Sequence, residues 1–254
     1  MNPYLKELEK IEFIISYACT GSCKHCSEGA HERGGEKINP DLASSALTKI
    51  TEHYGIKTLM CFGGEPLIYS EVTEAIMRAA KDLNIPHRQL ITNGYFSTDR
   101  EKISKTAKEL YECGVNDLLL SVDAFHQESI PLDVVKAFAN AARIEGIPIR
   151  LQPAWLVSPA NDNPYNRKTR EILDSFCDTG ISVSKGNVIF PEGNAKKYLS
   201  EYFKDAAPEN PYRENPHKVK CLSFEPNGEV LGENFYQKDI IEILENYTPN
   251  KIFH

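Results

Sequence analysis

Three cysteines are spaced closely enough to hold one metal centre. Cys19, Cys23 and Cys26 lie in the run CTGSCKHC, directly after an apolar segment. Thiolates hold iron–sulfur clusters, and three of them can hold a four-iron cluster by three corners, which leaves one iron open to another ligand. A zinc site would need a fourth ligand such as His25 or Cys61, and structural zinc usually uses two separated ligand pairs. A third interpretation makes the cysteines small core residues; the pattern favours the iron cluster.

Residues that could bind a small molecule follow the next expected strands. The run CFGGEP places Gly63, Gly64 and Glu65 directly after an expected strand at 58–62. Glycines let backbone carbonyls approach a ligand closely, and carbonyls with a carboxylate suit an ammonium group. The ordinary alternatives are a glycine turn and an acid at a helix N-terminus. Further candidates at the ends of later strands, which could also be turn or capping residues, are Asn93, Ser121, Asp123 and Gln152.

Short apolar runs alternate with longer helical patterns, which predicts an α/β protein with a parallel sheet of about six βα units. Strands are expected at 11–16, 58–62, 89–92, 117–122, 149–152 and 182–188. One helix is expected after Asn39 and Pro40, a capping residue followed by proline, and others at 69–83, 100–113, 132–145 and 164–177. Ligands of such folds collect at the carboxyl ends of the strands, where the candidate residues lie.

The composition narrows the class of function. A formal net charge of −7 argues against nonspecific binding to nucleic acid, which needs a basic surface. The sequence shows no signal peptide and no apolar segment long enough to span a membrane, so we expect a cytoplasmic protein with no membrane partner. In that reducing compartment the seven cysteines are better explained as metal ligands or core residues than as disulfides.

The motifs together resemble the radical S-adenosylmethionine (SAM) superfamily from Ile11 to about Val188. The resemblance implies a partial (β/α)6 TIM-like barrel with a [4Fe-4S] cluster on Cys19, Cys23 and Cys26. It further implies SAM bound at the open iron and cleaved reductively to a 5′-deoxyadenosyl radical that abstracts hydrogen from a substrate. The SAM contacts expected from this resemblance are Gly63, Gly64, Glu65, Asn93, Ser121, Asp123 and Gln152. An external one-electron donor such as a flavodoxin or ferredoxin is expected as well.

The sequence changes character after about residue 190, which predicts a core barrel at 1–190 and a short C-terminal α+β appendage at 191–254. The segment that begins at Cys221 resembles a truncated SPASM/twitch domain of peptide-modifying members. Only one of its cysteines is present, so we expect no second cluster. Cys221 itself is expected to be a buried remnant or a hydrogen-atom donor to the substrate.

The C-terminal resemblance suggests a peptide or protein residue as the substrate. Within the superfamily, the alternatives are a glycyl-radical-enzyme activase and an enzyme acting on a small molecule. From a different class, the chain could be a non-catalytic iron–sulfur protein for electron transfer or sensing, but that function leaves Gly63, Gly64 and Glu65 unexplained.

Overall fold

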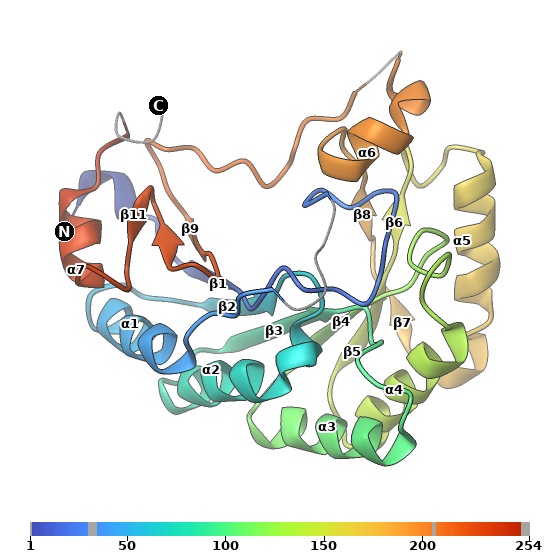
Figure 1. The fold of residues 1–254 in the computed structure, drawn as a ribbon, viewed down its shortest axis with the longest axis horizontal. Coiled ribbons are helices and arrows are strands. Elements are labelled where there is room, and N and C mark those ends of the chain that lie inside the picture. Colours follow the sequence, from blue (N-terminus) through green and yellow to red (C-terminus); the bar gives the residue numbers. More distant parts are fainter. Residues whose placement is uncertain (1, 30–34, 205–206, 250–254) are drawn as a thin grey trace.

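The computed structural model describes residues 2–29, 35–204 and 207–249. Its centre is a seven-stranded sheet in the order β7-β5-β4-β3-β2-β1-β9, with every adjacent pair parallel (Figure 1). The strands are β1 (Lys10–Ile14), β2 (Thr58–Phe62), β3 (His87–Thr92), β4 (Asp117–Ser121), β5 (Ile149–Gln152), β7 (Ser182–Val183) and β9 (Cys221–Phe224). The predicted α/β class with a parallel sheet is confirmed.

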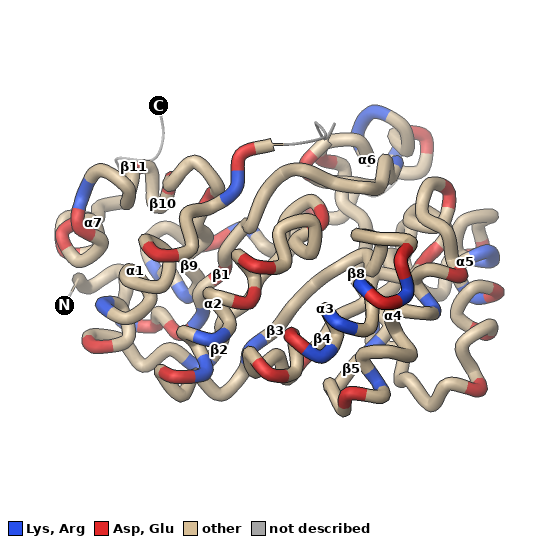
Figure 2. Tube along the Cα trace, turned by 60° about the horizontal axis from the view of Figure 1, so that its bottom comes forward, with Lys and Arg blue, Asp and Glu red and all other residues tan. Residues whose placement is uncertain are grey.

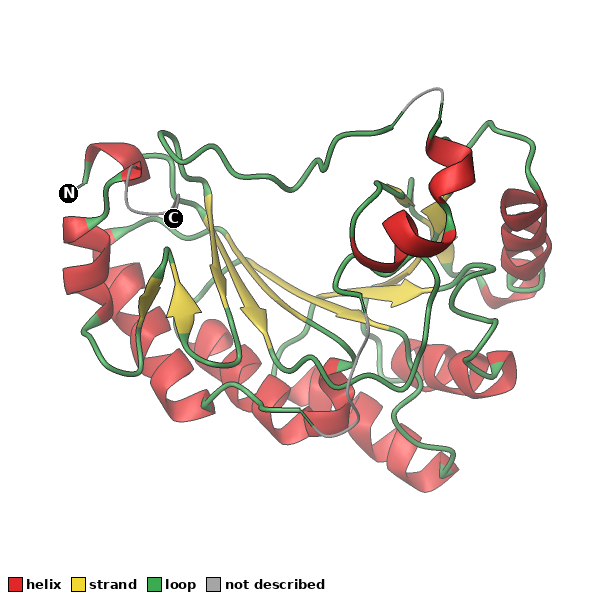
Figure 3. Cartoon of the chain, turned by 45° about the horizontal axis from the view of Figure 1, so that its top comes forward, coloured by secondary structure: helices red, strands yellow, loops and turns green. Residues whose placement is uncertain are grey.

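Helices cover the outer face of the sheet, while loops and the short helix α6 lie toward its other face (Figures 1 and 3). The helices are α1 (Pro40–His53), α2 (Ser70–Asp82), α3 (Arg100–Glu112), α4 (Leu132–Ile144), α5 (Pro164–Asp174), α6 (Gly193–Tyr198) and α7 (Ile240–Asn246). Single 3-10 turns occur at Pro3–Leu5, Pro66–Tyr69, Cys177–Thr179 and Ser200–Phe203.

Helix α1 shows why the predicted elements form. The side chain of Asn39 accepts hydrogen bonds from the backbone N–H groups of Asp41 and Leu42 at 3.0 and 3.1 Å, and Pro40 occupies the first turn. These contacts satisfy N–H groups that have no partner within the helix. The residues that α1 buries recur at helical spacing, which turns one apolar face toward the sheet; they are Ala43, Ala46, Leu47 and Ile50.

The expected strand at 182–188 is two strands, which corrects the prediction. β7 joins β5 in the main sheet, whereas β8 (Asn187–Val188) pairs with β6 (Ala154–Trp155) in a separate two-stranded sheet. Pro153 separates β5 from β6, and Gly186, with a φ of +71°, separates β7 from β8. A Cβ atom on Gly186 would lie 2.3 Å from the carbonyl oxygen of Pro153. Both breaks therefore occur where the segment after β5 and the segment after β7 pass close to each other.

The C-terminal segment contributes a strand to the main sheet. β9 pairs in parallel with β1, with Cys221 opposite Lys10 and Phe224 opposite Phe13. The rings of Phe13 and Phe224 are both fully buried, with centroids 4.8 Å apart. Beyond β9, the hairpin of β10 (Glu229–Val230) and β11 (Glu233–Asn234) leads into α7. The division into two units at residue 190 stays a prediction.

Charged residues of both signs are interspersed along the outer helices (Figure 2). Ion pairs four residues apart support α3, where Lys105 pairs with Glu109 and Lys108 with Glu112. Such exposed pairs contribute only a few tenths of a kcal/mol each, about 0.3–0.5. Among the described residues, no helix has the length and apolar character needed to cross a membrane.

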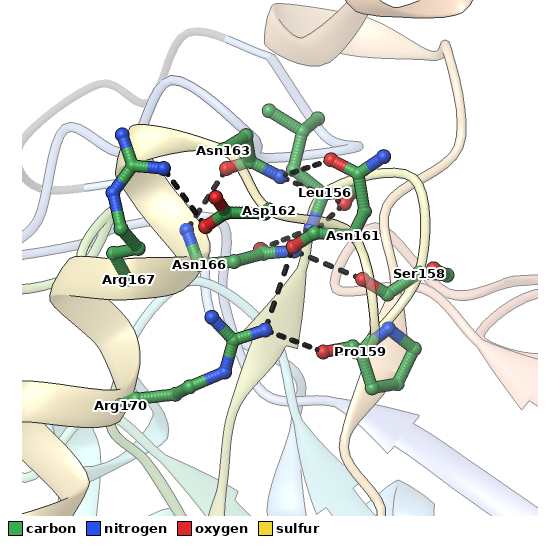
Figure 4. A network of polar contacts seen from close by, with 9 residues as sticks. All are labelled: Leu156, Ser158, Pro159, Asn161, Asp162, Asn163, Asn166, Arg167 and Arg170. Atoms are coloured by element: carbon green, nitrogen blue, oxygen red, sulfur yellow. Dashed lines mark hydrogen bonds and ion pairs between the residues drawn. The ribbon is translucent and has the colours of Figure 1, made fainter.

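A buried amide organises the loop between β6 and α5 (Figure 4). The Asn166 side chain is fully buried and accepts a hydrogen bond from the N–H of Leu156 at 2.9 Å. Its amide nitrogen donates to the carbonyl oxygens of Leu156, Ser158 and Asn161 at 2.9 to 3.0 Å. Asn163 and Arg170 add hydrogen bonds to the same loop, which is therefore held by side chains rather than by regular secondary structure.

Replacing this amide by a carboxylate tests its role. Asn166→Asp would place a carboxylate oxygen against three carbonyl oxygens, each of which keeps at least one other donor. We expect the free energy of unfolding to fall by about 3 kcal/mol, since a buried acceptor without a donor costs about 1–3 kcal/mol and more when it is charged. Urea denaturation measures the change. Asn140→Asp, at an exposed position on α4, is the matched control and should leave stability nearly unchanged; equal effects would contradict the assignment.

Candidate functional site

The segment 15–29, called the cysteine loop here, carries Cys19, Cys23 and Cys26, follows β1 and crosses the carboxyl edge of the sheet. Cys23 is buried, and Cys19 and Cys26 are half-buried; all seven cysteines of the chain are reduced thiols. Burial raises the pKa of the Cys19 thiol to about 11, and Glu65 and Cys26 add to the rise. Burial, Asp123 and the other two cysteines also raise the pKa of Cys23. A bound cation would reverse this effect by favouring the thiolates, so the three thiols suit a positively charged iron centre.

Two glycines bring the loop against β2. The N–H of Gly64 donates to the carbonyl oxygen of Ser16, and the N–H of Glu65 donates to that of Ala18, both at 2.8 Å. A Cβ atom on Gly64 would lie 2.2 Å from the carbonyl oxygen of Ala18, and one on Gly63 would lie 2.5 Å from that of Ser16. Real Cβ atoms do not approach oxygen so closely. The glycines therefore permit backbone contact between β2 and the cysteine loop.

Glu65 connects β2 to β3. Its fully buried carboxylate accepts hydrogen bonds from Thr92 Oγ1 at 2.7 Å and from the N–H groups of Asn93 and Leu67 at 2.8 and 2.9 Å. Burial raises the pKa of Glu65 to about 7, and these hydrogen bonds partly oppose the rise. Three bonds occupy most of the roughly four acceptor positions of a carboxylate.

Asn93 extends the same connection to the cysteines. Its side-chain amide nitrogen lies 3.7 Å from Cys19 Sγ and 3.3 Å from Thr20 Oγ1. Its side-chain oxygen accepts a hydrogen bond from the N–H of Tyr95 at 2.8 Å. The structure thus brings together Gly63, Gly64, Glu65, Asn93 and Cys19, whose roles as SAM contacts and cluster ligand stay predictions.

Asp123 makes the contacts of a turn or capping residue, the alternative that the sequence analysis gave for it, and its contact with SAM stays a prediction. Oδ1 accepts hydrogen bonds from the N–H groups of Phe125 and His126 at 2.9 and 3.0 Å. Oδ2 accepts one from the N–H of Ala154 at 3.0 Å and lies 2.8 Å from His126 Nδ1. Burial alone would raise the pKa of Asp123, but His126 and these hydrogen bonds lower it to about 2. Asp123 therefore organises the turn after β4 and orients His126.

The remaining predicted residues lie elsewhere on the strands. Ser121 is buried at the carboxyl end of β4, opposite Gln152. The side chain of Gln152 hydrogen-bonds Asn187 at 3.1 Å and also Ser184, which connects β5 to the segment between β7 and β8. Their contact with SAM stays a prediction.

Cys221 is not brought to the cysteine loop. It lies at the amino end of β9, opposite Lys10 of β1. Cys19 follows the carboxyl end of β1, so at about 3.3 Å per strand residue the two cysteines are separated by at least the length of that strand. This placement gives no support to a role in hydrogen donation.

A cavity of about 560 Å³ opens beside Cys19. One side is the cysteine loop at Ala18, Cys19 and Thr20, and the other is the segment after β3 together with Ile68 of the turn after β2. The segment after β3 contributes two aromatic and two hydroxylic side chains: Tyr95, Phe96, Ser97 and Thr98. The sequence analysis included Asn93 but stopped before residues 95–98, although their position directly after a strand end could have drawn attention to them.

His126 was not among the predicted site residues. Asp123 and His126 are three residues apart, and their side chains meet only because the chain turns tightly after β4. Its ring centroid lies 4.8 Å from that of His25 in the cysteine loop. An Asp followed three residues later by His at a strand end was the available signal.

A methyl group at Gly64 should push the cysteine loop away from β2. We expect Gly64→Ala to lower the free energy of unfolding by about 3 kcal/mol, as overpacking against backbone does, and to raise the reactivity of Cys23 toward a thiol reagent. Gly55→Ala is the control, because nothing lies within 4 Å of a Cβ atom there. Equal stability and thiol reactivity of the two variants would refute the docking role of Gly64.

Known proteins similar to this chain fall into two groups. A relative described as probable GTP 3',8-cyclase, from Methanocaldococcus jannaschii, is 23% identical over 226 residues, which cover 87% of this chain and 72% of the relative. A protein of the same description from Sulfolobus acidocaldarius is 26% identical over 119 residues, and that match covers 47% of this chain and only 36% of the relative.

Solved structures share the fold at lower identity. Streptococcus suis SuiB bound to the precursor peptide SuiA superposes with a TM-score of 0.65 at 14% identity, over 97% of this chain and 66% of SuiB. The protein anSMEcpe with bound AdoMet and a peptide gives a TM-score of 0.56 at 16% identity, over 91% of this chain and 75% of that one. The family described as Radical SAM superfamily matches residues 13–205, and the chain therefore belongs to the radical SAM superfamily.

Proposed function

We propose that Cys19, Cys23 and Cys26 hold the [4Fe-4S] cluster of this radical SAM enzyme, and that SAM binds beside Cys19. The observation that carries the proposal is the convergence of the cysteine loop, the Gly63–Glu65 segment and the cavity at one edge of the sheet. The donor set fits, because three thiols in a partly buried loop suit iron better than the oxygen-preferring cations. An external one-electron donor, such as a flavodoxin or ferredoxin, would reduce the cluster.

The cluster and SAM, when bound, supply reductive cleavage of SAM and removal of hydrogen from a substrate. The chain's own residues position the two groups. Asn93 lies against Cys19 Sγ, where an amide N–H can donate to a thiolate. The Glu65 carboxylate accepts a hydrogen bond from the N–H of Asn93. Its one remaining acceptor position would bind the SAM ammonium, together with the nearby backbone carbonyls.

The cavity residues suit the rest of SAM. Tyr95 and Phe96 offer aromatic faces to the adenine ring. The hydroxyl groups of Ser97 and Thr98 can exchange hydrogen bonds with the ribose. Enclosing the reactive carbon between these side chains and the loop would exclude water from the radical.

The substrate that we propose is a peptide or protein residue. The charge beside the cysteine loop carries this step: burial, the hydrogen bond to Glu225 and the carboxylates of Glu225, Glu28 and Glu229 raise the pKa of Tyr17, the residue before Ala18 of the cavity. Burial also raises the pKa of Glu225, and Glu28 and Glu229 add to the rise. Like charges this close repel an anionic ligand, so this side of the loop favours a cationic or neutral peptide over a nucleoside triphosphate.

A purine nucleotide is the second candidate substrate. It is favoured by the matches to proteins described as probable GTP 3',8-cyclases, which reach 98% coverage of this chain. The acidic groups around Tyr17 argue against it, and the two candidates are separated by experiment.

Removing any proposed cluster ligand should abolish SAM cleavage. We expect Cys19→Ala, Cys23→Ala and Cys26→Ala each to lose the brown colour after anaerobic reconstitution and to release less than about 1% of the parent's 5′-deoxyadenosine with dithionite, because a cluster with two protein ligands is poorly held. Cys177→Ala is the matched control, since Cys177 is exposed. Retention of the parent's iron content by all three variants would refute the ligand assignment.

Transfer of hydrogen from the substrate to 5′-deoxyadenosine identifies the substrate class. We expect uniformly deuterated, Lys- or Arg-flanked synthetic peptides to place deuterium in 5′-deoxyadenosine, whereas GTP neither accelerates SAM cleavage nor yields a cyclised product. Glu225→Gln should weaken the response to the cationic peptides several-fold, as expected for loss of one charge near the surface. A cyclised product from GTP, without transfer from the peptides, would replace the peptide proposal by the nucleotide candidate.

A further inference from the structure

A second set of metal-binding side chains overlaps the cysteine loop. Cys23 Sγ, one ring nitrogen of His25 and one ring nitrogen of His126 all lie within 4.8 Å of one another. Thiolate and imidazole together are the donors that zinc prefers, with Zn–S near 2.3 Å and Zn–N near 2.0–2.1 Å. These bond lengths imply ligand separations of roughly 3.5 Å in a tetrahedral site, so the three atoms need to close by only about 1 Å.

The orientation of His126 is the one that metal-binding histidines have. Its Nδ1 lies 2.8 Å from Asp123 Oδ2, which leaves Nε2 as the nitrogen that can bind a metal. A carboxylate behind the ring is the usual partner of a ligating histidine, because it fixes the tautomer and the direction of the ring. Asp123 is itself held by three backbone N–H groups, so this orientation is rigid.

His25 supplies an independent observation. Its Nδ1 atom is buried and has no hydrogen-bond partner among the described residues. Leaving a buried nitrogen without a partner is unfavourable, and core packing alone would not require it. The ring also contacts Phe125, with centroids 5.0 Å apart, so packing fixes its place while one nitrogen stays without a partner.

We propose that Cys23, His25 and His126 form a site for Zn²⁺, or another divalent cation that prefers nitrogen and sulfur, in the chain without its cluster. Water completes the fourth position. Because Cys23 belongs to both sets of ligands, zinc at this site and a cluster on the cysteine loop exclude one another. The exclusion rests on the proposed cluster ligands, whereas zinc binding does not.

Metal binding by the full chain, stripped of iron and kept reduced, tests the site directly. Co²⁺ serves as the probe, since it gives a thiolate charge-transfer band and tetrahedral d–d bands, and Zn²⁺ is then used to displace it. We expect one Co²⁺ per chain, and a loss of affinity of at least about tenfold in His25→Ala and in His126→Ala. His87→Ala, at an exposed position, is the control and should bind as the parent does.

A double variant separates this site from the three-cysteine site. Cys19→Ser with Cys26→Ser cannot hold the proposed cluster, yet it keeps all three proposed zinc ligands. It should retain the parent's affinity for Co²⁺ and its thiolate band. Loss of binding in the double variant, parental affinity in both histidine variants, or absence of a thiolate band in the parent would each overturn the proposal.

Competition between Zn²⁺ and cluster formation gives a second test of the site. One equivalent of Zn²⁺ added before iron and sulfide should slow cluster formation in the parent several-fold, and His126→Ala should remove most of that delay. Cluster formation that proceeds normally with no zinc binding would leave the proposed function intact and overturn only the zinc site. Zinc binding in a chain that never forms a cluster would leave the zinc site intact and overturn the proposed function.

Discussion

The close backbone contact between β2 and the cysteine loop is the constraint on which the site depends. Hydrogen bonds from Gly64 and Glu65 to the loop continue the β1–β2 ladder beyond the strands, and only glycine leaves room for them. The Glu65 side chain then crosses to β3, and Asn93 of β3 returns to Cys19. Each contact fixes the next, so the loop has one arrangement although it contains no regular secondary structure.

The C-terminal segment supports the same loop from the other side. β9 covers the edge of β1 that would otherwise present unpaired backbone groups. Glu225, directly after β9, accepts the hydrogen bond from Tyr17 in the cysteine loop. Asn2 also donates to the carbonyl oxygens of Leu244 and Tyr247, which ties the start of the chain to α7. The segment therefore acts as part of the scaffold that positions the cysteines.

Sequence alone predicted most of the elements and the strand ends at which the candidate site residues lie. Strands β1 to β5 were recognisable because each is a short apolar run followed by a distinct turn. The parallel pairing of β9 with β1 could not be predicted, since residues about 210 positions apart carry no local signal of their contact. The same limit explains Asp123: its position at a strand end was clear, but its partner Ala154 comes from a different strand. Gly186 was missed because its close neighbour, Pro153, is also distant in sequence.

The buried carboxylate of Asp123 contacts more than one element of the fold. Removing a carboxylate from water costs several kcal/mol unless hydrogen bonds and a cation replace the lost hydration. Three backbone donors and the His126 ring, whose Nδ1 lies 2.8 Å from Oδ2, surround the carboxylate and lower the pKa of Asp123 to about 2. A helix-capping role would need only the first two donors. The contact to Ala154 connects the end of β4 to β6. The contact to His126 orients the ring that lies near Cys23. One buried carboxylate therefore contacts both the strands and a neighbour of the cysteine loop.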